Sequence, residues 1–342
     1  MKKIKTNETI SELLKKGMAK EDIKKFLAKK KVSCSEEEIE KERLNIKGRE
    51  KFSEPEKMSF SAEDLRFATP EIVAEYRAER ITGKIIADLC CGIGSQSIAF
   101  AKKFSKVYAI DKDSRKIECA KANAKAFGIE NIEFICADVF ADSTIKLISD
   151  ADAIFCDPER APEEAERKLE SIPFVELICR KYSKITKNIA IELPPQLTPD
   201  KIDSRKYSCE KEYLSLKGKL NRLDIYFGEL KKCETSAVIL PENERIESKN
   251  EAFQEKKSQI LSYLYELNPA VEKAGLSGEA AKIFHGELFL CFRSSRASFF
   301  TSNENIGSHF FERNKVIASC PNSAHEIISV LKECHAGKAV LR

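Results

Sequence analysis

Tryptophan is absent from this sequence of 342 residues, and histidine occurs only four times, each time beyond residue 280. A histidine-based metal centre is therefore excluded from the first 280 residues. No stretch approaches the roughly 18 uninterrupted apolar residues of a membrane span. The basic N-terminus is followed neither by an apolar core nor by a small-residue cleavage site. The sequence predicts a protein that has no signal peptide, uses no metal and does not associate with membranes.

Cysteine pairs at metal-ligand spacing are also missing. The 12 cysteines are scattered, none forms a C-x-x-C pair, and most lie inside apolar runs such as IEFICADVF. We therefore expect reduced, buried thiols in a cytoplasmic protein. Lys and Arg number 59 against 55 for Asp and Glu, a balance that neither requires nor excludes a nucleic-acid partner. The composition, 42% hydrophobic and 33% charged, is that of a globular chain of two or three domains, and it leaves the oligomeric state open.

Apolar runs alternate with helical segments through the middle of the chain. The runs GKIIADL, KVYAID, IEFICAD, DAIFCDP and NIAIEL are continuously apolar, which is typical of strands buried on both faces. Because helical periodicity fills the gaps between them, we predict an α/β fold with an open, parallel, Rossmann-like sheet covered by helices. The later runs EYLSLKG, RLDIYFG and SAVILP have short connections and favour an antiparallel edge.

Composition divides the chain into four predicted parts. Residues 1–56 are charge-dense, with apolar residues at the spacing of two short amphipathic helices. Residues 57–241 contain the predicted sheet. The polar stretch 242–259 is predicted to be a linker, and residues 260–342 form a smaller α+β unit.

The strongest motif is IIADLCCGIGSQSIAFA, residues 85–101. Here a predicted strand ends near Asp88, a turn carries Gly92 and Gly94, and a helix begins near Ser95. Glycines allow close approach of a ligand to the backbone, and the first N–H groups of a helix favour polar or anionic groups. A dinucleotide fingerprint requires a third glycine where this sequence has Ser97, which disfavours a nicotinamide cofactor.

This motif resembles motif I of class I S-adenosylmethionine-dependent methyltransferases, which has the pattern D-x-x-C-G-x-G. The resemblance implies that Asp111, at the end of the second strand, accepts the ribose hydroxyls of the cofactor. It also implies that Asp138, after the third strand, binds the adenine amine, while Val139 and Phe140 cover the adenine ring. Each acid alone is more simply a strand-end residue, but three on consecutive strands favour a site. The predicted cofactor contacts are Asp88, Cys90, Gly92, Gly94, Ser95, Gln96, Asp111, Lys112, Asp138, Val139 and Phe140.

The fourth strand ends in the tetrad Asp157-Pro158-Glu159-Arg160. Ligands of open α/β sheets bind outside the carboxyl ends of the strands, so we predict that these four residues are the catalytic ones. The tetrad resembles the D-P-P or N-P-P motif of nucleic-acid amino-methyltransferases, although Glu159 and Arg160 replace the second proline and the aromatic. It is also similar to the D-P-A-R motif of uridine C5-methyltransferases. Those enzymes need a cysteine after the fifth strand, where this chain reads Glu192-Leu193-Pro194-Pro195, so covalent C5 chemistry is disfavoured.

The chain as a whole resembles a prokaryotic family of class I methyltransferases with a C-terminal THUMP-like domain. KFSEPEKMSFSAEDLRFATPEIVAEYRA resembles the segment before motif I in that family, and YLYELNPAVEKAGL resembles the start of its THUMP-like unit. The core is also similar to trimethylguanosine synthases, but their S-P-P-W motif is absent, which argues against cap methylation. The resemblance implies S-adenosylmethionine as cofactor and a base in structured RNA as substrate, with tRNA first and rRNA next.

Basic residues in the terminal segments are candidate phosphate contacts for such an RNA. They are Lys24, Lys25, Lys29, Lys30 and Lys31 in the N-terminal segment and Arg293, Arg296, Arg313 and Lys315 in the C-terminal unit. Three alternative functions stay open, namely a protein or small-molecule methyltransferase, a binding module that retains the cofactor without turnover, and an oxidoreductase. For the terminal segments, the alternative is that they only pack on the sheet or form a dimer contact.

Overall fold

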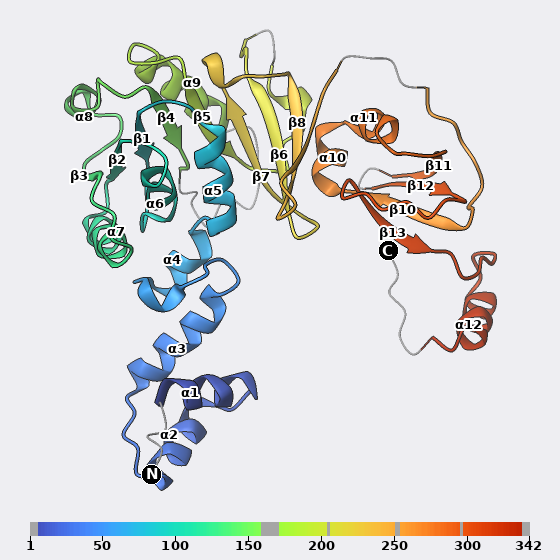
Figure 1. Ribbon diagram of the computed structural model, residues 1–342, viewed down its shortest axis with the longest axis horizontal. Helices are drawn as coiled ribbons and strands as arrows, with labels where there is room; N and C mark the ends of the chain where they lie inside the picture. The colour runs from blue at the N-terminus through green and yellow to red at the C-terminus, as the bar shows by residue number, and fades with distance from the viewer. Residues whose placement is uncertain (1–5, 159–170, 204–205, 250–253, 295–296, 337–342) are drawn as a thin grey trace. The chain divides into compact units, whose positions relative to one another are not determined.

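The computed structural model describes residues 6–158, 171–203, 206–249, 254–294 and 297–336 (Figure 1). Their contacts divide the chain into two compact units. The first unit comprises Met1–Glu192 with Tyr226–Leu230, and the second comprises Leu193–Ile225 with Lys231–Arg342. This division falls inside the segment 57–241, and the predicted domain limits stay predictions.

Helices open the first unit, namely α1 (Thr6–Lys15), α2 (Lys20–Lys29) and α3 (Glu36–Gly48). Their apolar faces share a core of Ile10, Leu13, Ile23, Leu27 and Ile39. The sequence periodicity predicted the first two but not α3. A capping box begins α3, because Glu38 N–H donates to the Ser35 hydroxyl (3.1 Å) and Ser35 N–H donates to the Glu38 carboxylate (2.7 Å).

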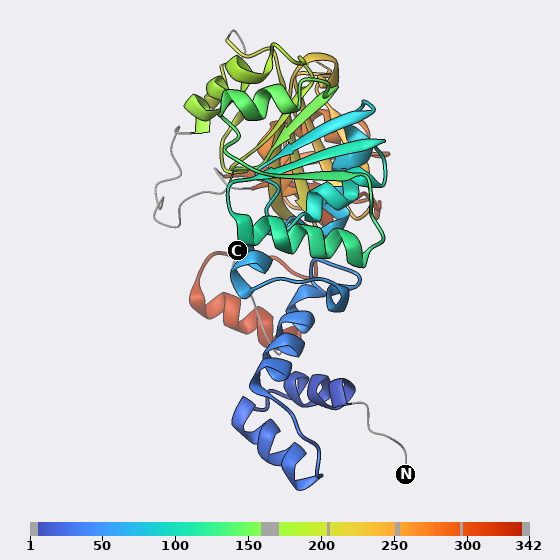
Figure 2. The same cartoon turned by 90° about the vertical axis from the view of Figure 1, so that its left-hand side faces the viewer.

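A parallel sheet forms the centre of the first unit, with the strand order β3-β2-β1-β4-β5. Its strands are β1 (Ile85–Leu89), β2 (Lys106–Asp111), β3 (Ile132–Cys136), β4 (Ala153–Cys156) and β5 (Ile189–Leu193). The accompanying helices are α4 (Ala62–Phe67), α5 (Glu71–Arg80), α6 (Ser95–Ala101), α7 (Ser114–Ala126), α8 (Asp142–Leu147) and α9 (Ser171–Tyr182). Figure 2 shows α7 and α9 on opposite sides of these strands. The predicted Rossmann-like sheet is confirmed.

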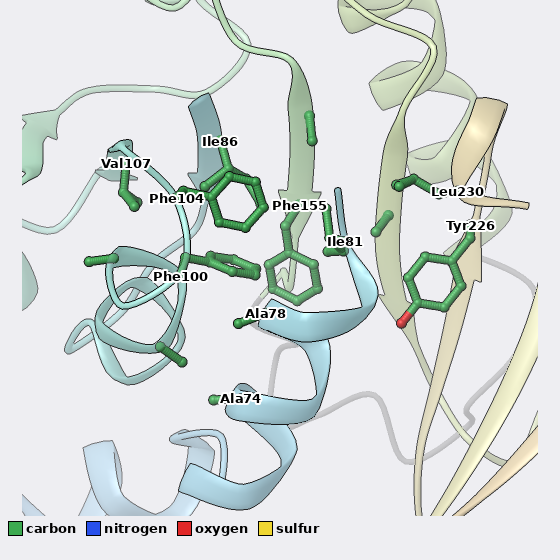
Figure 3. Packing of buried hydrophobic residues seen from close by; sticks show 14 residues of the cluster. Ala74, Ala78, Ile81, Ile86, Phe100, Phe104, Val107, Phe155, Tyr226 and Leu230 are labelled. Carbon is green, nitrogen blue, oxygen red and sulfur yellow. The ribbon is translucent and has the colours of Figure 1, made fainter. Parts of the chain in front are cut away.

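The core of this unit lies between the sheet and the helices α5 and α6 (Figure 3). Phe100 of α6 and Phe155 of β4 are buried, and their rings meet edge to face with centroids 5.5 Å apart. Phe104 packs against Phe100 in the same way at 5.8 Å. Such buried aromatic pairs fix the helix against the sheet, and with it the loop that joins β1 to α6.

The second unit begins with β6 (Glu210–Leu216), β7 (Lys219–Tyr226), β8 (Thr235–Leu240) and β9 (Glu244–Glu247). Lys217 and Gly218, both with positive φ, connect β6 to β7. The chain has reversed twice when it reaches β8, so β8 pairs with β6 in parallel, and the predicted antiparallel edge is wrong for this pair. Strand β9 pairs antiparallel with β8 and lies within the predicted linker, held there by Arg245 beside Glu212 (3.0 Å).

The C-terminal part of the second unit has an antiparallel sheet in the order β11-β12-β10-β13. Its elements are β10 (Tyr263–Leu267), α10 (Pro269–Ala274), α11 (Ser277–Lys282), β11 (Phe289–Arg293), β12 (Ser298–Ser302), β13 (Phe311–Lys315) and α12 (Ala324–Glu333). Rings of Tyr265, Phe284 and Phe311 meet edge to face in its core. The predicted smaller α+β unit is therefore present.

Among the residues that the structure describes, no helix is long and apolar enough to span a membrane. The cysteines are all free thiols. In the same residues, no group of three or more His, Cys, Asp or Glu side chains could hold a metal ion.

Candidate functional site at the strand ends

The carboxyl ends of four parallel strands meet at one edge of the sheet. In the strand register Leu89 pairs with both Ile110 of β2 and Cys156 of β4, and Asp111 pairs with Cys136 of β3. The predicted cofactor residues and Asp157 lie at or just after these strand ends, with Asp88 inside β1 and Asp111 as the last residue of β2. Parallel pairing thus brings them to the edge where open α/β sheets bind ligands.

The loop between β1 and α6 has an unusual backbone. Cys90, Gly92 and Gly94 have φ values of 66°, 56° and 83°. A Cβ atom at Gly94 would lie 3.0 Å from Cβ of Ala120 on α7, so glycine permits both the conformation and the close approach of α6 to α7. A Cβ atom at Gly92 would meet nothing within 4 Å. Gly92 therefore borders open space.

The carboxylate of Asp111 accepts a hydrogen bond from the backbone of this loop. Gly92 N–H donates to one oxygen of its carboxylate, and Asp113 N–H donates to the other, each at 3.0 Å. A carboxylate oxygen accepts more than one hydrogen bond, so both oxygens keep acceptor capacity. Lys112, which follows, is exposed, and its carbonyl oxygen accepts a weak bond from the Cys136 thiol (3.7 Å).

Asp88 lies beneath the loop and is 1% exposed. Its carboxyl accepts a short hydrogen bond from the Ser97 hydroxyl of α6. Burial raises the pKa of Asp88 to about 7, and the Ser97 bond and the charge of Arg77 oppose that shift. Asp88 therefore ties the end of β1 to α6 from below.

Gln96 is likewise turned inward. It is 4% exposed, its amide nitrogen donates to the carbonyl oxygen of Ala74 (3.1 Å), and its oxygen accepts from Arg77 (3.4 Å). Arg77 is fully buried, forms an ion pair with Glu192 of β5, and lies over the Phe155 ring at 4.9 Å. Ser95, the first residue of α6, is half-buried.

The third strand end carries an ordered turn. Phe140 N–H donates to the side chain of Asp138 at 2.9 Å. Asp138 is exposed, Val139 is buried and Phe140 is half-buried. The turn thus carries the exposed carboxylate of Asp138 and the half-buried ring of Phe140, and Val139 between them is buried.

The fourth strand end brings the tetrad to the same edge. Asp157 N–H donates to the carbonyl oxygen of Leu89 (3.4 Å), which joins the ends of β4 and β1. Asp157 and Pro158 are half-buried. Glu159 and Arg160 lie outside the described residues.

Sequence reasoning missed side chains that hold this edge together. The amide of Asn123 on α7 donates to the carbonyl oxygen of Ile93 in the loop (2.9 Å) and accepts from Ser59 N–H (2.6 Å). Asn is a poor helix former, so an asparagine inside a helical pattern was a usable signal. Arg77 lies four residues after the buried Val73 and therefore on the same face of α5. This helical spacing was the signal that the cationic side chain of Arg77 is buried.

A pocket that is open to solvent lies in the first unit, and Ser95, a predicted cofactor contact, is among the residues that line it. It is lined by apolar side chains that include Met58, Ile98 and Phe127, with Glu71 and Lys102 among its polar residues. Neither Asp111 nor Asp138 lines it.

Comparisons with known proteins point to RNA methyltransferases. An uncharacterized RNA methyltransferase from Leptospira interrogans is 36% identical over 85 residues, 25% of this chain and 22% of its own length. A 23S rRNA (uracil(1939)-C(5))-methyltransferase from Shewanella amazonensis is 32% identical over 80 residues, 23% of this chain and 18% of its own. The chain thus spans about a fifth of the length of these curated relatives.

One solved structure, described as a methyltransferase from Porphyromonas gingivalis W83, shares the fold with a TM-score of 0.65 and 18% identity. The similarity covers 80% of this chain and 71% of that one. A profile described as tRNA (Uracil-5-)-methyltransferase matches residues 4–147. A second profile, described as RNA cap guanine-N2 methyltransferase, matches residues 83–264, more than half of the chain. The chain therefore belongs to the RNA cap guanine-N2 methyltransferase family.

Proposed function

We propose that this protein is an S-adenosylmethionine-dependent methyltransferase that modifies a base in structured RNA, with tRNA as the first candidate and rRNA as the next, in the cytoplasm. The observation that carries the proposal is the edge formed by the ends of β1, β2, β3 and β4. Within it, Asp111 ends β2, Asp138 follows β3 and Asp157 follows β4, next to a loop that borders open space.

The side chains of this edge fit the cofactor. Both oxygens of Asp111 keep acceptor capacity, which suits the two ribose hydroxyls. The exposed carboxylate of Asp138 suits the adenine amine, and Val139 with Phe140 suits the flat face of the ring. The remaining polar groups of the cofactor would contact the backbone at Cys90, Gly92, Gly94 and Ser95 and the adjacent Lys112. Asp88 and Gln96 support this loop from beneath.

Bound S-adenosylmethionine supplies a sulfonium methyl group that is already activated for transfer. The protein must then align the accepting atom, because positioning supplies much of the rate enhancement in such a reaction. Asp157 accepts a hydrogen bond from a proton-bearing group of the target base, and the rigid Pro158 orients it. Glu159 and Arg160 complete the tetrad, with Arg160 assigned to a phosphate or to Glu159.

An RNA substrate is supported by the relatives from Leptospira interrogans and Shewanella amazonensis, whose names specify RNA. The terminal segments supply further support. Lys25 and Lys29 of α2 and Lys31 just after it are exposed. Lys24 pairs with Glu36 (2.8 Å), and the exposed Lys30 lies over the Phe26 ring. We assign residues 1–56 to RNA contact on this basis.

The C-terminal sheet is proposed as a THUMP-like unit that contacts RNA. Arg313 and Lys315 are exposed on its edge strand β13, whereas Arg293 pairs with Glu255. Phe300, Phe310 and Phe311 are buried, so these phenylalanines serve the core and not base stacking. We keep 57–241 as the methyltransferase domain, 242–259 as the connection and 260–342 as this unit. Arg296 lies outside the described residues.

Nucleoside analysis tests the proposal. RNA from cells with and without the gene is separated into tRNA and rRNA, digested to nucleosides and measured by mass spectrometry. We expect one methylated nucleoside to decrease in one fraction when the gene is absent and to return with a plasmid copy. Identical profiles in both fractions would contradict an RNA substrate.

A further inference from the structure

Helix α9 is fastened to the turn that follows β3. Tyr182, the last residue of the helix, is fully buried, and its hydroxyl donates a short hydrogen bond to the carbonyl oxygen of Val139. Val139 is 7% exposed, so its carbonyl lies largely out of reach of water. Without the hydroxyl, this carbonyl would lose its buried partner, which carries a cost of its own.

Two further contacts join the same pair of elements. The ring of Phe174 on α9 meets the ring of Phe140 edge to face, with centroids 5.8 Å apart. Lys181 forms an ion pair with Asp142 at 3.0 Å, at the start of α8. The helix thus contacts the chain at Val139 and at two residues that follow it, Phe140 and Asp142.

The hydroxyl of Tyr182 keeps the proton that it donates in this hydrogen bond. Burial raises the pKa of this phenol, with a smaller contribution from the neighbouring Cys156 thiol. The group therefore stays protonated at neutral pH. Because Phe140 N–H bonds back to Asp138, a bond at the Val139 carbonyl fixes the whole turn.

We propose that Tyr182 is a positioning residue for the adenine subsite, which holds Asp138 and Phe140 in place through the carbonyl of Val139. The inference rests on the proposed cofactor, and it assigns recognition of the cofactor's base to the packing of α9. A turn held in this way discriminates between bases better than a free turn, because its carboxylate cannot move to accommodate a wrong group.

The test compares S-adenosylhomocysteine with its inosine analogue, in which an oxo group replaces the adenine amine. Calorimetry gives the affinity of both ligands for the full-length wild type and for Tyr182→Phe. We expect the wild type to prefer the adenine ligand. In Tyr182→Phe the affinity for that ligand should fall about fivefold to tenfold, and the preference over the inosine analogue should shrink by a similar factor. A merely structural loss would lower both affinities equally.

Tyr213→Phe is the matched control, because the buried Tyr213 also donates to a main-chain carbonyl, that of Leu197 (2.6 Å). It should leave both affinities unchanged. If Tyr182→Phe does not fold, Phe174→Leu replaces it under the same criterion. Unchanged affinities, or an unchanged preference, would overturn the inference, as would a wild type without preference. A wild type that binds neither ligand would instead refute the proposed cofactor.

Discussion

Two aspartates at neighbouring strand ends are both buried but have different hydrogen-bond partners. Asp88 is enclosed and bonded to Ser97, whereas Asp111 receives backbone N–H groups from Gly92 and Asp113 at the mouth of the loop. Both end apolar runs and look equivalent in the sequence. Their surroundings predict different roles, since the enclosed carboxyl supports the loop and the other carboxylate retains acceptor capacity for a ligand.

Asp111→Asn should weaken the binding of S-adenosylhomocysteine by about 10- to 100-fold, the equivalent of losing charge-assisted hydrogen bonds. Calorimetry measures this, with Glu133→Gln on the outer strand β3 as a control that should bind like the wild type. Equal affinity for wild type and Asp111→Asn would remove Asp111 from the proposed ribose contact.

Asp88 predicts a pH dependence of stability. Burial raises its pKa in the folded state to about 7, from an ordinary value of 3.8. The folded state therefore retains this proton longer than the unfolded state, so its contribution is complete below about pH 4 and is lost as pH rises towards 7. Relative to Asp88→Asn, the wild type should lose up to about 4 kcal/mol of unfolding free energy across that range. Denaturant titrations at several pH values measure this difference, and parallel pH profiles for the two proteins would contradict it.

Secondary-structure elements were predictable where the pattern is local. The apolar runs correctly indicated the parallel strands β1, β2, β4 and β5, whose residues are nearly all buried, as expected for strands covered on both faces. They also indicated β3, although its residues are half-buried or exposed. The partner of a later strand is not local information, so the parallel pairing of β8 with β6 was missed. The sequence pattern also did not reveal whether a side chain of the motif faces the ligand site or the protein interior. Gln96 sits in a loop motif typical of ligand contacts, yet its amide bonds to α5.

The approach of α6 to α7 gives a prediction for a pair of glycines. Gly94→Ala adds a Cβ atom 3.0 Å from Cβ of Ala120 at a residue with φ of +83°, whereas Gly128→Ala adds one in open space at φ of +67°. Both variants incur backbone strain of about 1 kcal/mol or more, and overpacking adds about 1–3 kcal/mol at Gly94 alone. Thermal unfolding should therefore rank Gly94→Ala clearly below Gly128→Ala. Equal melting temperatures would show that α6 and α7 are not tightly packed at this point.

In the whole molecule, we propose that the sheet edge binds the cofactor and that the terminal segments bind a large substrate. A small molecule needs only a site at the strand ends, whereas an RNA extends well beyond it. Composition predicted charge-dense terminal segments. Composition could not indicate which basic residues of these segments are available to bind RNA phosphates, because an ion pair such as that of Lys24 with Glu36 depends on where α3 packs.

The exposed lysines in and just after α2 therefore predict salt-dependent RNA binding. Replacing Lys25, Lys29 and Lys31 by alanine should weaken RNA binding and lower the slope of log affinity against log salt by about 2–3, because each phosphate contact contributes about 0.7–0.9. Filter binding at several salt concentrations measures this slope. Binding of S-adenosylhomocysteine should be unaffected. An unchanged slope would assign these lysines to the solvated surface alone.

We propose that the protein transfers a methyl group to RNA at the sheet edge that carries Asp157. The most direct measurement incubates the purified protein with labelled S-adenosylmethionine and RNA from cells that lack the gene, and compares wild type with Asp157→Ala. We predict labelled RNA with the wild type and none with the variant, whose affinity for S-adenosylhomocysteine stays unchanged, the signature of an interaction made with the target. A folded Asp157→Ala protein that labels RNA as well as the wild type, or a wild type that labels none, would contradict the account.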